Sequence, residues 1–540
     1  MTTLPPDLFR RRFIQAGAVG LLLPPEYANA QTQQEVGNRL LKLPRTALVI
    51  GNSKYRYAPL ANPANDGRAI AAQLKLSGFE VTLQTDVARE PMERAIEAYA
   101  ALLAKTKAIG LFYFAGHGVQ LAWRNYLLPV DAAIDGVADI PRQCVDVGTL
   151  VAGITKAANA MNVVILDACR DNPFGSEKQI DQKGLSQLDA PPETLLAYAT
   201  SPGNVASDGD GANGLYTENL LRELKVPETK IEDVFKRVRL GVRRRSNGQQ
   251  IPWESTSLEE DFYFFPPKDL KEISEADRDR QFSDELAQWE KIKASVDPVP
   301  LEEFLRRYPS GPFSELAQLH LERALAARGE RRVRIASQEG NPFTKGSAEA
   351  NLKWQTGDRY TYRLTNLLAT APPRTLTQRV DEITGTEVRY NNGIVTDLLG
   401  NVLRRQGGRE YTANQSEPLE YVVGKQWSTQ YRITTLDGNS GRTEMDLRIA
   451  ARETITVPAG TFNAFRIEGR GIFQQESGRV EITTLRKWVA PDRLRREVAM
   501  EETRETSRDV RSDGKRRRID RAQSRVTQSQ RWELMSFSQG

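Results

Sequence analysis

Apolar and polar positions follow two different periods along the first half of the chain. From Arg45 to about Phe265, short β-branched or apolar runs alternate with stretches of helical periodicity. This order predicts an open, mostly parallel α/β sheet with helices on both faces. The predicted strands are Ala47–Gly51, Glu80–Gln84, Ile109–Phe114, Asn162–Asp167 and Thr194–Thr200. The predicted helices are Pro63–Leu76, Arg89–Thr106, Leu150–Ala158, Asn213–Leu224 and Lys230–Arg245.

The pattern changes after Pro266-Pro267, so we place the first domain at residues 42–265. Residues 268–337 are charged and helical in period, with Pro309 and Gly311 between two amphipathic stretches. This is typical of a tetratricopeptide-like helix pair, which is too short to stack as a solenoid. The sequence therefore predicts a small helical linker domain here.

Residues 345–503 change again, to Thr, Arg, Val and Gly with period-two alternation. That pattern predicts a C-terminal antiparallel β domain. Residues 504–540 are highly charged, and we expect a solvated tail. The alternative is a polybasic phosphate- or lipid-binding patch around Lys515-Arg516-Arg517-Arg518.

The first thirty residues have the form of an export signal. Arg10-Arg11-Arg12 precedes a weakly apolar stretch, Ala16–Leu23, and a small-residue site, Ala28-Asn29-Ala30. This predicts a twin-arginine signal over residues 1–30 and a periplasmic or secreted protein. The alternative is a cytoplasmic tail with a chance arginine cluster. No apolar run approaches the length of a transmembrane helix.

Composition narrows the chemistry. The net charge of +5 arises from 75 Lys and Arg against 70 Asp and Glu, so it indicates no nucleic-acid partner. The chain has two histidines, His117 and His320, and two cysteines, Cys144 and Cys169. A zinc site needs more of these residues close together, and we expect no metal. Neither a P-loop nor GxGxxG follows the first predicted strand, which excludes the common nucleotide-dependent classes.

Two reactive residue types stand at neighbouring strand ends. Ile109–Phe114 leads into Ala115-Gly116-His117-Gly118, and Asn162–Asp167 leads into Cys169. Consecutive strands of such a sheet usually lie side by side, and their carboxyl ends form sites. His117 and Cys169 therefore suit acyl transfer to a thiolate, with the Gly118 and Cys169 amides facing the oxyanion.

In this order, these motifs resemble the caspase-like cysteine peptidases of the metacaspase and paracaspase branch. The matching segments are Arg45–Asn52, Leu60–Asp66, Tyr113–Gly118, Leu166–Arg170 and Ala197–Gly203. The resemblance implies a caspase-hemoglobinase fold, a His117–Cys169 dyad and endopeptidase activity on protein or peptide substrates.

The resemblance also implies an acidic specificity pocket, with Asp66 and Asp167 matching its carboxylates and a candidate third, Asp208 or else Asp210, in the loop that follows. Such a pocket favours cleavage after Arg or Lys. No cofactor is implied; the calcium-binding acidic segment of many metacaspases has no clear match, so calcium activation stays open. The segment Asp171–Pro192, with Lys178 and Lys183, is the place where relatives are cut during maturation.

Other interpretations remain. The caspase-like fold could serve as a catalytically quiet scaffold, or the β domain could bind an envelope partner. Asp66 and Asp167 could cap helices or pair with Arg68 or Arg170. Cys144 is expected to be a passive thiol, or else a disulfide partner that silences Cys169. His320 is expected on a polar helix face, without a role.

Overall fold

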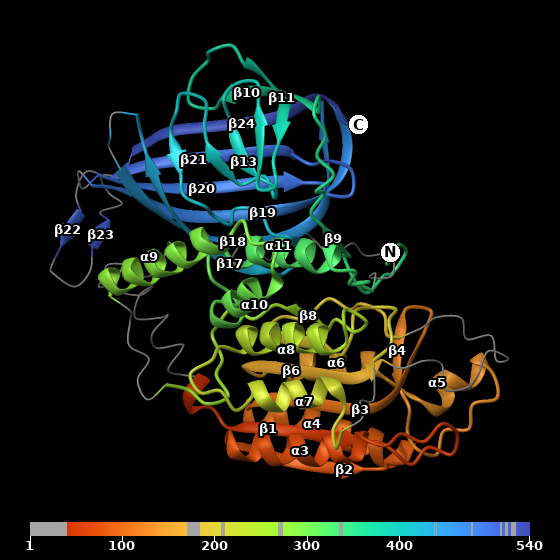
Figure 1. The fold of residues 1–540 in the computed structure, drawn as a ribbon. Coiled ribbons are helices and arrows are strands. Elements are labelled where there is room, and N and C mark those ends of the chain that lie inside the picture. The colour runs from red at the N-terminus through yellow and green to blue at the C-terminus, as the bar shows by residue number, and fades with distance from the viewer. Residues whose placement is uncertain are drawn as a thin grey trace, which may run out of the picture.

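The computed structural model describes residues 40–169, 184–206, 211–267, 274–333, 338–436, 438, 440–476, 479–507, 510–512, 517–519 and 525–540. An α/β domain forms one end of the molecule and a β domain the other, with three helices between them (Figure 1). The predicted signal segment, residues 1–30, lies outside the described residues.

The α/β domain is built on five parallel strands in the order β2-β1-β3-β6-β7. They are β1 (Arg45–Gly51), β2 (Phe79–Thr85), β3 (Ile109–Leu121), β6 (Met161–Cys169) and β7 (Thr194–Tyr198). An antiparallel edge strand, β8 (Trp253–Thr256), completes the row beside β7. The predicted fold class is therefore confirmed.

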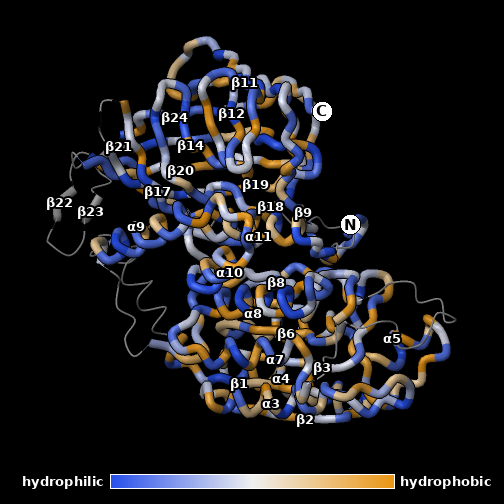
Figure 2. Tube along the Cα trace, viewed as in Figure 1, coloured by the Kyte–Doolittle hydropathy of each residue, from blue (hydrophilic) through white to orange (hydrophobic). Residues whose placement is uncertain are grey.

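Helices cover both faces of this sheet because the strand order reverses at β1. The helices are α3 (Pro63–Leu76), α4 (Arg89–Thr106), α6 (Val147–Ala157), α7 (Leu215–Glu223) and α8 (Ile231–Arg245). Right-handed crossovers put α3 on one face, and α4 and α6 on the other. Contacts of α7 with α3 and α8 add these two helices to the first face. Figure 2 shows the strands between these layers as the most hydrophobic part of the domain.

Strand β3 continues beyond its predicted end. It runs through His117 to Leu121 and turns back as β4 (Arg124–Leu127), which pairs with β5 (Val145–Asp146). The side chains of a separate hydrophobic cluster, including Tyr55, Val119 and Cys144, pack around this hairpin. His117 consequently lies within strand β3, three residues beyond the predicted strand end at Phe114.

The helices α9 (Glu275–Ile292), α10 (Pro298–Arg307) and α11 (Ser314–Ala327) share one hydrophobic cluster with the β domain. Trp289 and Phe304 of the helices belong to this cluster, as do Tyr362 and Phe462 of the β domain. Leu240 of α8 packs against it as well. The helical unit therefore joins the two larger domains through apolar packing.

The β domain is a closed antiparallel barrel of the strands β10-β11-β12-β13-β14-β15-β17-β18-β19-β20-β21-β24. The strands are β10 (Arg359–Asn366), β11 (Arg374–Ile383), β12 (Glu387–Tyr390), β13 (Val395–Asp397), β14 (Val402–Arg404), β15 (Glu410–Tyr411), β17 (Gln426–Thr434), β18 (Ser440–Val457), β19 (Gly460–Gln475), β20 (Val480–Val489), β21 (Glu497–Ser507) and β24 (Arg525–Ser538). Short strands β9 (Ser347–Glu349) and β16 (Glu420–Val422) form a separate pair, and so do β22 (Val510–Ser512) and β23 (Arg517–Ile519).

The prediction that a solvated tail begins at residue 504 is wrong for the described part of that segment. Strand β21 continues to Ser507, and β24 pairs with both β10 and β21 and so closes the barrel. The charge that suggested a tail belongs to cross-strand pairs, such as Arg531 with Glu501 and Arg363 with Glu533 at 2.6 Å. Two of the four residues of the predicted basic patch lie outside the described residues.

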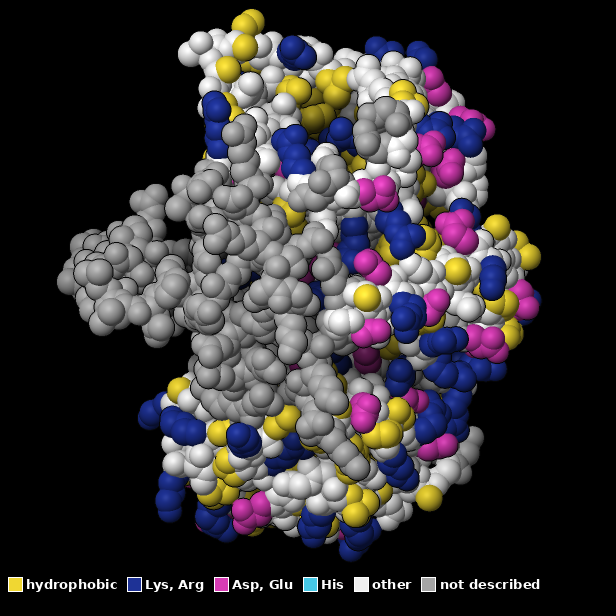
Figure 3. Space-filling view, turned by 90° about the vertical axis from the view of Figure 1, so that its left-hand side faces the viewer, with side chains coloured by type: hydrophobic (Ala, Val, Ile, Leu, Met, Phe, Trp, Pro, Cys, Tyr) yellow, Lys and Arg dark blue, Asp and Glu magenta, His cyan; other side chains and the backbone are white. Residues whose placement is uncertain are grey.

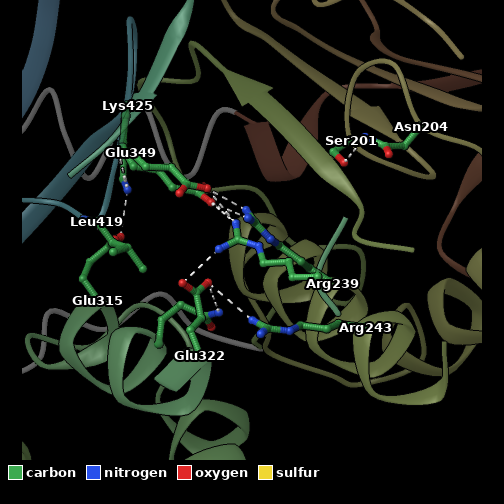
Figure 4. A network of polar contacts seen from close by, with 12 residues as sticks. Ser201, Asn204, Arg239, Arg243, Glu315, Glu322, Glu349, Leu419 and Lys425 are labelled. Atoms are coloured by element: carbon green, nitrogen blue, oxygen red, sulfur yellow. Dashed lines mark hydrogen bonds and ion pairs between the residues drawn. The ribbon is translucent and has the colours of Figure 1, made fainter. Parts of the chain in front are cut away.

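An ion-pair network joins all three parts of the molecule (Figure 4). Arg239 of α8 donates to Glu420 of β16 over 3.0 Å. Arg243 of the same helix pairs with Glu330 at 2.6 Å, and Lys425 pairs with Glu315 of α11 at 2.8 Å. Because most of these side chains are largely buried, their charges are poorly screened, and the network fixes how the parts sit together.

Elsewhere the surface carries mixed charge. Figure 3 shows basic and acidic side chains interspersed over the described part of the face that it draws. Among the described residues, no helix is long and apolar enough to span a membrane.

Candidate active site

The candidate site lies where the strand order of the α/β sheet reverses. Strand β1 lies between β2 and β3, so the connections leaving β1 and β3 run to opposite faces. The crevice at the carboxyl ends of such strands is the usual ligand site of open α/β sheets. The segment that follows β1 approaches His117 of β3 here.

His117 is held by two contacts from the segment after β1. Its backbone N–H donates to the Tyr55 hydroxyl over 2.9 Å, and its Nε2 lies 2.7 Å from the carbonyl oxygen of Ala58. The Tyr55 ring packs on the imidazole, with the ring centroids 4.5 Å apart. The Tyr55 hydroxyl in turn donates to the carbonyl of Leu128. These contacts fix both the position and the tilt of the imidazole.

The contact with Ala58 also sets the tautomer of His117. A carbonyl oxygen only accepts, so Nε2 carries the hydrogen. In the neutral imidazole the lone pair then lies on Nδ1. The geometry therefore leaves Nδ1 as the basic atom of the ring.

Cys169 ends β6 beside this histidine. Strand β3 pairs with β6 in parallel, and the register places Gly118 opposite Cys169. Hydrogen-bonded strands lie about 4.8 Å apart, so the backbones of the two predicted residues are close. The structure describes the backbone of Cys169, whereas residues 170–183, with Arg170 and the predicted maturation segment up to Lys183, lie outside the described residues.

Gly118 and Gly116 have no room for a side chain. A Cβ on Gly118 would lie 2.6 Å from the carbonyl oxygen of Ala168, and one on Gly116 would lie 2.4 Å from the Tyr55 hydroxyl. The first contact is with backbone, which cannot move aside easily. Glycine is therefore required on both sides of His117, because neighbouring atoms lie where a Cβ would be.

Asp66 and Asp167 are both buried and both face the start of α7. Asp66 accepts from the Asn213 side chain at 2.9 Å and from the Gly214 N–H at 3.0 Å. Asp167 accepts from the Thr217 hydroxyl at 2.8 Å. Gly214 is the N-cap of α7, so the contact of Asp66 has the helix-capping character of the alternative interpretation. Arg68 donates to Asn65.

One buried hydroxyl is near both carboxylates. Burial, together with the charges of Asp167 and Asp66, raises the pKa of Tyr113 well above its ordinary value. Its hydroxyl lies 2.6 Å from that of Thr217. The structure thus gathers two of the three predicted pocket carboxylates at one place, while Asp208 lies outside the described residues.

The remaining cysteine and histidine lie elsewhere. Cys144 is a free thiol buried in the cluster beneath β4, and burial raises the pKa of its thiol to about 12. His320 packs against Trp289 with the ring centroids 5.5 Å apart. Burial, with a smaller effect of Arg323, lowers the pKa of His320 to about 4. The expectation of a polar-face histidine is wrong, because the ring is partly covered by α9.

Sequence reasoning missed the groups that support His117. Ala58 acts through its backbone carbonyl, which leaves no side-chain signal, and Tyr55 stands in a segment without a clear pattern. Among the described residues, no group of three or more His, Cys, Asp or Glu side chains is placed to hold a metal ion.

Comparisons with known proteins concern the α/β domain. The family model described as the caspase domain matches residues 44–263. The human mucosa-associated lymphoid tissue lymphoma translocation protein 1 is 27% identical over 203 residues, covering 36% of this chain and 24% of the relative. Its mouse homolog is 28% identical over 203 residues, covering 36% and 23%. The chain thus spans about a quarter of the length of these curated relatives.

A solved structure is also similar in part. The crystal structure of caspase-1 from Spodoptera frugiperda has 16% identity and a TM-score of 0.33, covering 42% of this chain and 93% of that one. The family match covers the domain that carries His117 and Cys169. Residues 44–263 are therefore similar in sequence to the caspase domain of the caspase-like peptidases.

Proposed function

We propose that the chain is a cysteine-type endopeptidase that cleaves after Arg or Lys, with His117 and Cys169 as its catalytic pair. The observation that carries this proposal is the setting of His117. Its Nε2 is engaged by the Ala58 carbonyl, and the adjacent strand in register ends at Cys169. A base of fixed tautomer beside a cysteine is the minimal apparatus for acyl transfer to sulfur.

The proposed reaction needs no group beyond these two and water. Nδ1 of His117 takes the proton of the Cys169 thiol, and the resulting thiolate attacks the substrate carbonyl carbon while the electron pair of the C=O bond moves to oxygen. His117 donates a proton from Nδ1 to the leaving nitrogen as the C–N bond breaks, which leaves a thioester. His117 then takes a proton from water, which attacks the thioester and releases the acid and the thiolate. We propose that no cofactor takes part.

The Gly118 and Cys169 amides are the proposed oxyanion donors. The backbone register of β3 and β6 brings these residues opposite each other. Without a side chain on Gly118, a substrate carbonyl can come close to its amide. Preorganised donors of this kind typically contribute about 3 kcal/mol each to the transition state.

The preference for Arg or Lys rests on Asp66 and Asp167. Both carboxylates are buried; Asp66 accepts from Asn213 and Gly214, and Asp167 accepts from Thr217. A cation from the substrate is the natural complement of two carboxylates at one place. We include Asp208 as a third pocket residue on the family resemblance.

We also propose that residues 1–30 direct export to the periplasm or beyond by the twin-arginine route. The support is the sequence Arg10-Arg11-Arg12 followed by the small-residue site that ends at Ala30. N-terminal sequencing of the protein recovered from a bacterial periplasm tests this. A mature chain that begins at Gln31 supports export, and an intact N-terminus in the cytoplasm contradicts it.

The activity is tested with fluorogenic peptides that end in Arg, Lys or Asp, in the presence of reductant, with calcium or with chelator. We expect turnover of the Arg and Lys peptides by the wild type and none by Cys169→Ala. Cys144→Ala is the matched control, because it removes the other cysteine, which is buried in a separate cluster.

Three results would count against the proposal. Turnover that survives in Cys169→Ala contradicts the nucleophile. Cleavage after Asp alone contradicts the acidic pocket. Silence on all peptides under every condition favours a catalytically quiet scaffold, in which the helical and β units do the binding.

A further inference from the structure

The segment that returns to the sheet after Cys169 is held by a distant part of the chain. Residues 184–190, here called the return segment, precede β7 and are largely buried. Residues 338–347, here called the strap, connect the helical unit to the barrel. The two lie against each other although they are separated by about 150 positions, as the Gln187–Gln338 contact shows.

Two residues of the return segment make six hydrogen bonds with the strap. The backbone carbonyl of Gln187 accepts a hydrogen bond from the Asn341 side-chain amide at 2.9 Å, and its Oε1 accepts one from the Ser347 hydroxyl at 3.2 Å. Its N–H donates to Gln338 at 3.1 Å. Every one of these contacts crosses from the α/β domain to the strap.

The hydrogen bonds of the Asp189 carboxylate to the strap are shorter than those of Gln187. Its Oδ1 accepts from the Thr344 hydroxyl at 2.6 Å, and its Oδ2 accepts from the Lys345 N–H at 2.7 Å. Its own N–H donates to the carbonyl of Phe343 at 3.1 Å. Hydrogen bonds to a carboxylate are about twice as strong as neutral ones, so Asp189 is the main anchor of the return segment.

The other side of the return segment faces the candidate site. Ser186 exchanges hydrogen bonds with Asn125, in the strand that follows the turn after His117, with its N–H donating at 2.8 Å. Leu185 is fully buried, and its Cδ2 would lie 3.1 Å from a Cβ on Gly118. Leu185 therefore packs directly on the backbone of Gly118, which stands opposite Cys169.

From this continuous path of contacts, we infer that the strap is a positioning element of the proposed peptidase site. It holds Asp189 and Gln187, which hold Leu185 against Gly118 and so fix the strand end that carries His117. Arg124 lies over the Phe343 ring, at 5.5 Å from its centroid, and ties the strap to the same turn. Asp189 and Thr344 are thus positioning residues, and the site depends on a segment outside the caspase domain.

This inference rests on the proposed function, and its test uses a readout that needs no known substrate. The rate at which iodoacetamide alkylates Cys169 is measured at several pH values by mass spectrometry of the peptide that contains it. Because only the thiolate reacts, the pH dependence of this rate reports how far the Cys169 thiol is ionised. Cys144 does not interfere, because it is buried and its thiol pKa is raised to about 12. Turnover of the Arg or Lys peptide gives kcat and KM for the same preparations.

The variants are Asp189→Ala and Thr344→Val, with Thr361→Val on the barrel as the matched control. We expect Asp189→Ala to lower kcat at least tenfold with little change in KM, because a misplacement of 1 Å costs on the order of a hundredfold. Its alkylation profile should shift toward higher pH, since His117 no longer stabilises the thiolate fully. Thr344→Val should show a smaller effect of the same kind, and Thr361→Val none.

The outcomes separate the two proposals. If the wild-type Cys169 already titrates as an ordinary thiol, the proposed function fails and the inference falls with it. If the wild type has a reactive thiolate and Asp189→Ala matches Thr361→Val in alkylation and in kcat, the inference alone is overturned. A lower melting temperature of Asp189→Ala with unchanged rates would show that the strap is merely structural.

Discussion

Glu420 offers a quantitative test of the network that joins the three parts of the molecule. Burial alone raises the pKa of this carboxyl, but the charge and hydrogen bonds of Arg239, with Arg332 and Lys425, lower it to about 2 from an ordinary value of 4.5. Each pKa unit corresponds to about 1.4 kcal/mol, so the ionised form of Glu420 contributes about 3 kcal/mol to folding at pH 7. Its side chain is 15% exposed, so solvent screening takes little from this value.

The pH dependence of this contribution has a definite sign. The folded state favours the charged carboxylate, so the contribution is complete above the unfolded pKa of 4.5 and is lost as the pH falls through about 2. At pH 3 about 1.5 kcal/mol should remain. Glu420→Gln removes the charge and keeps the size of the side chain.

The assay is urea unfolding followed by tryptophan fluorescence at pH 7 and pH 3. Glu410→Gln is the matched control, because Glu410 pairs with Arg404 at 3.1 Å while both side chains are more than half exposed. Such surface pairs contribute less than about 1 kcal/mol. The reasoning is refuted if Glu420→Gln costs no more than Glu410→Gln at pH 7, or if its cost does not shrink at pH 3.

Three further predictions concern single side chains. Gly118→Ala should abolish peptide turnover, because its Cβ would lie 2.6 Å from the Ala168 carbonyl oxygen. Gly136→Ala should retain full turnover, because its Cβ would have no atom within 4 Å. Equal turnover rates of the two variants would contradict the argument. Tyr55→Phe should lower kcat about tenfold with little change in KM, since it removes the acceptor of the buried His117 N–H. Tyr57→Phe changes an exposed tyrosine of the same segment and is the control. An unchanged kcat in Tyr55→Phe would show that this hydrogen bond does not position His117. Burial, opposed by the Phe313 N–H, raises the pKa of Glu285 to about 8, so the folded state holds a proton that the unfolded state releases above about 4.5. Stability should therefore fall as the pH rises from 5 to 8, by on the order of 3 kcal/mol, and Glu285→Gln should abolish that fall in thermal melts while Glu290→Gln does not.

The sheet of the α/β domain could be predicted because its strands are nearly continuous apolar runs. Strand β1 is buried along its whole length, and the predicted helices at Pro63–Leu76 and Arg89–Thr106 have the observed bounds. The adjacency of β3 and β6 follows from their order in the chain. These features depend on periodicity, which a single sequence displays directly.

Other features depend on contacts that periodicity does not encode. The Ala58 carbonyl that orients His117 is a backbone group, and the strap meets the return segment through polar side chains far away in the sequence. The sequence predicts a tail where strand β24 lies, because the charges of this strand pair with charges of neighbouring strands and do not follow an apolar pattern. Tertiary partners decide all three cases.

The closure of the barrel has a consequence for how the chain folds. Strand β10 pairs with β24, and the Tyr360 hydroxyl bonds to Gln539, a partner 179 positions later. Until β24 is available, β10 and β21 present open edges that can pair with other chains. Contacts of such long range are slow to form. Barrel closure should therefore be a late step of folding. A chain shortened before β24 should aggregate through these open edges even though the α/β domain keeps all of its internal contacts.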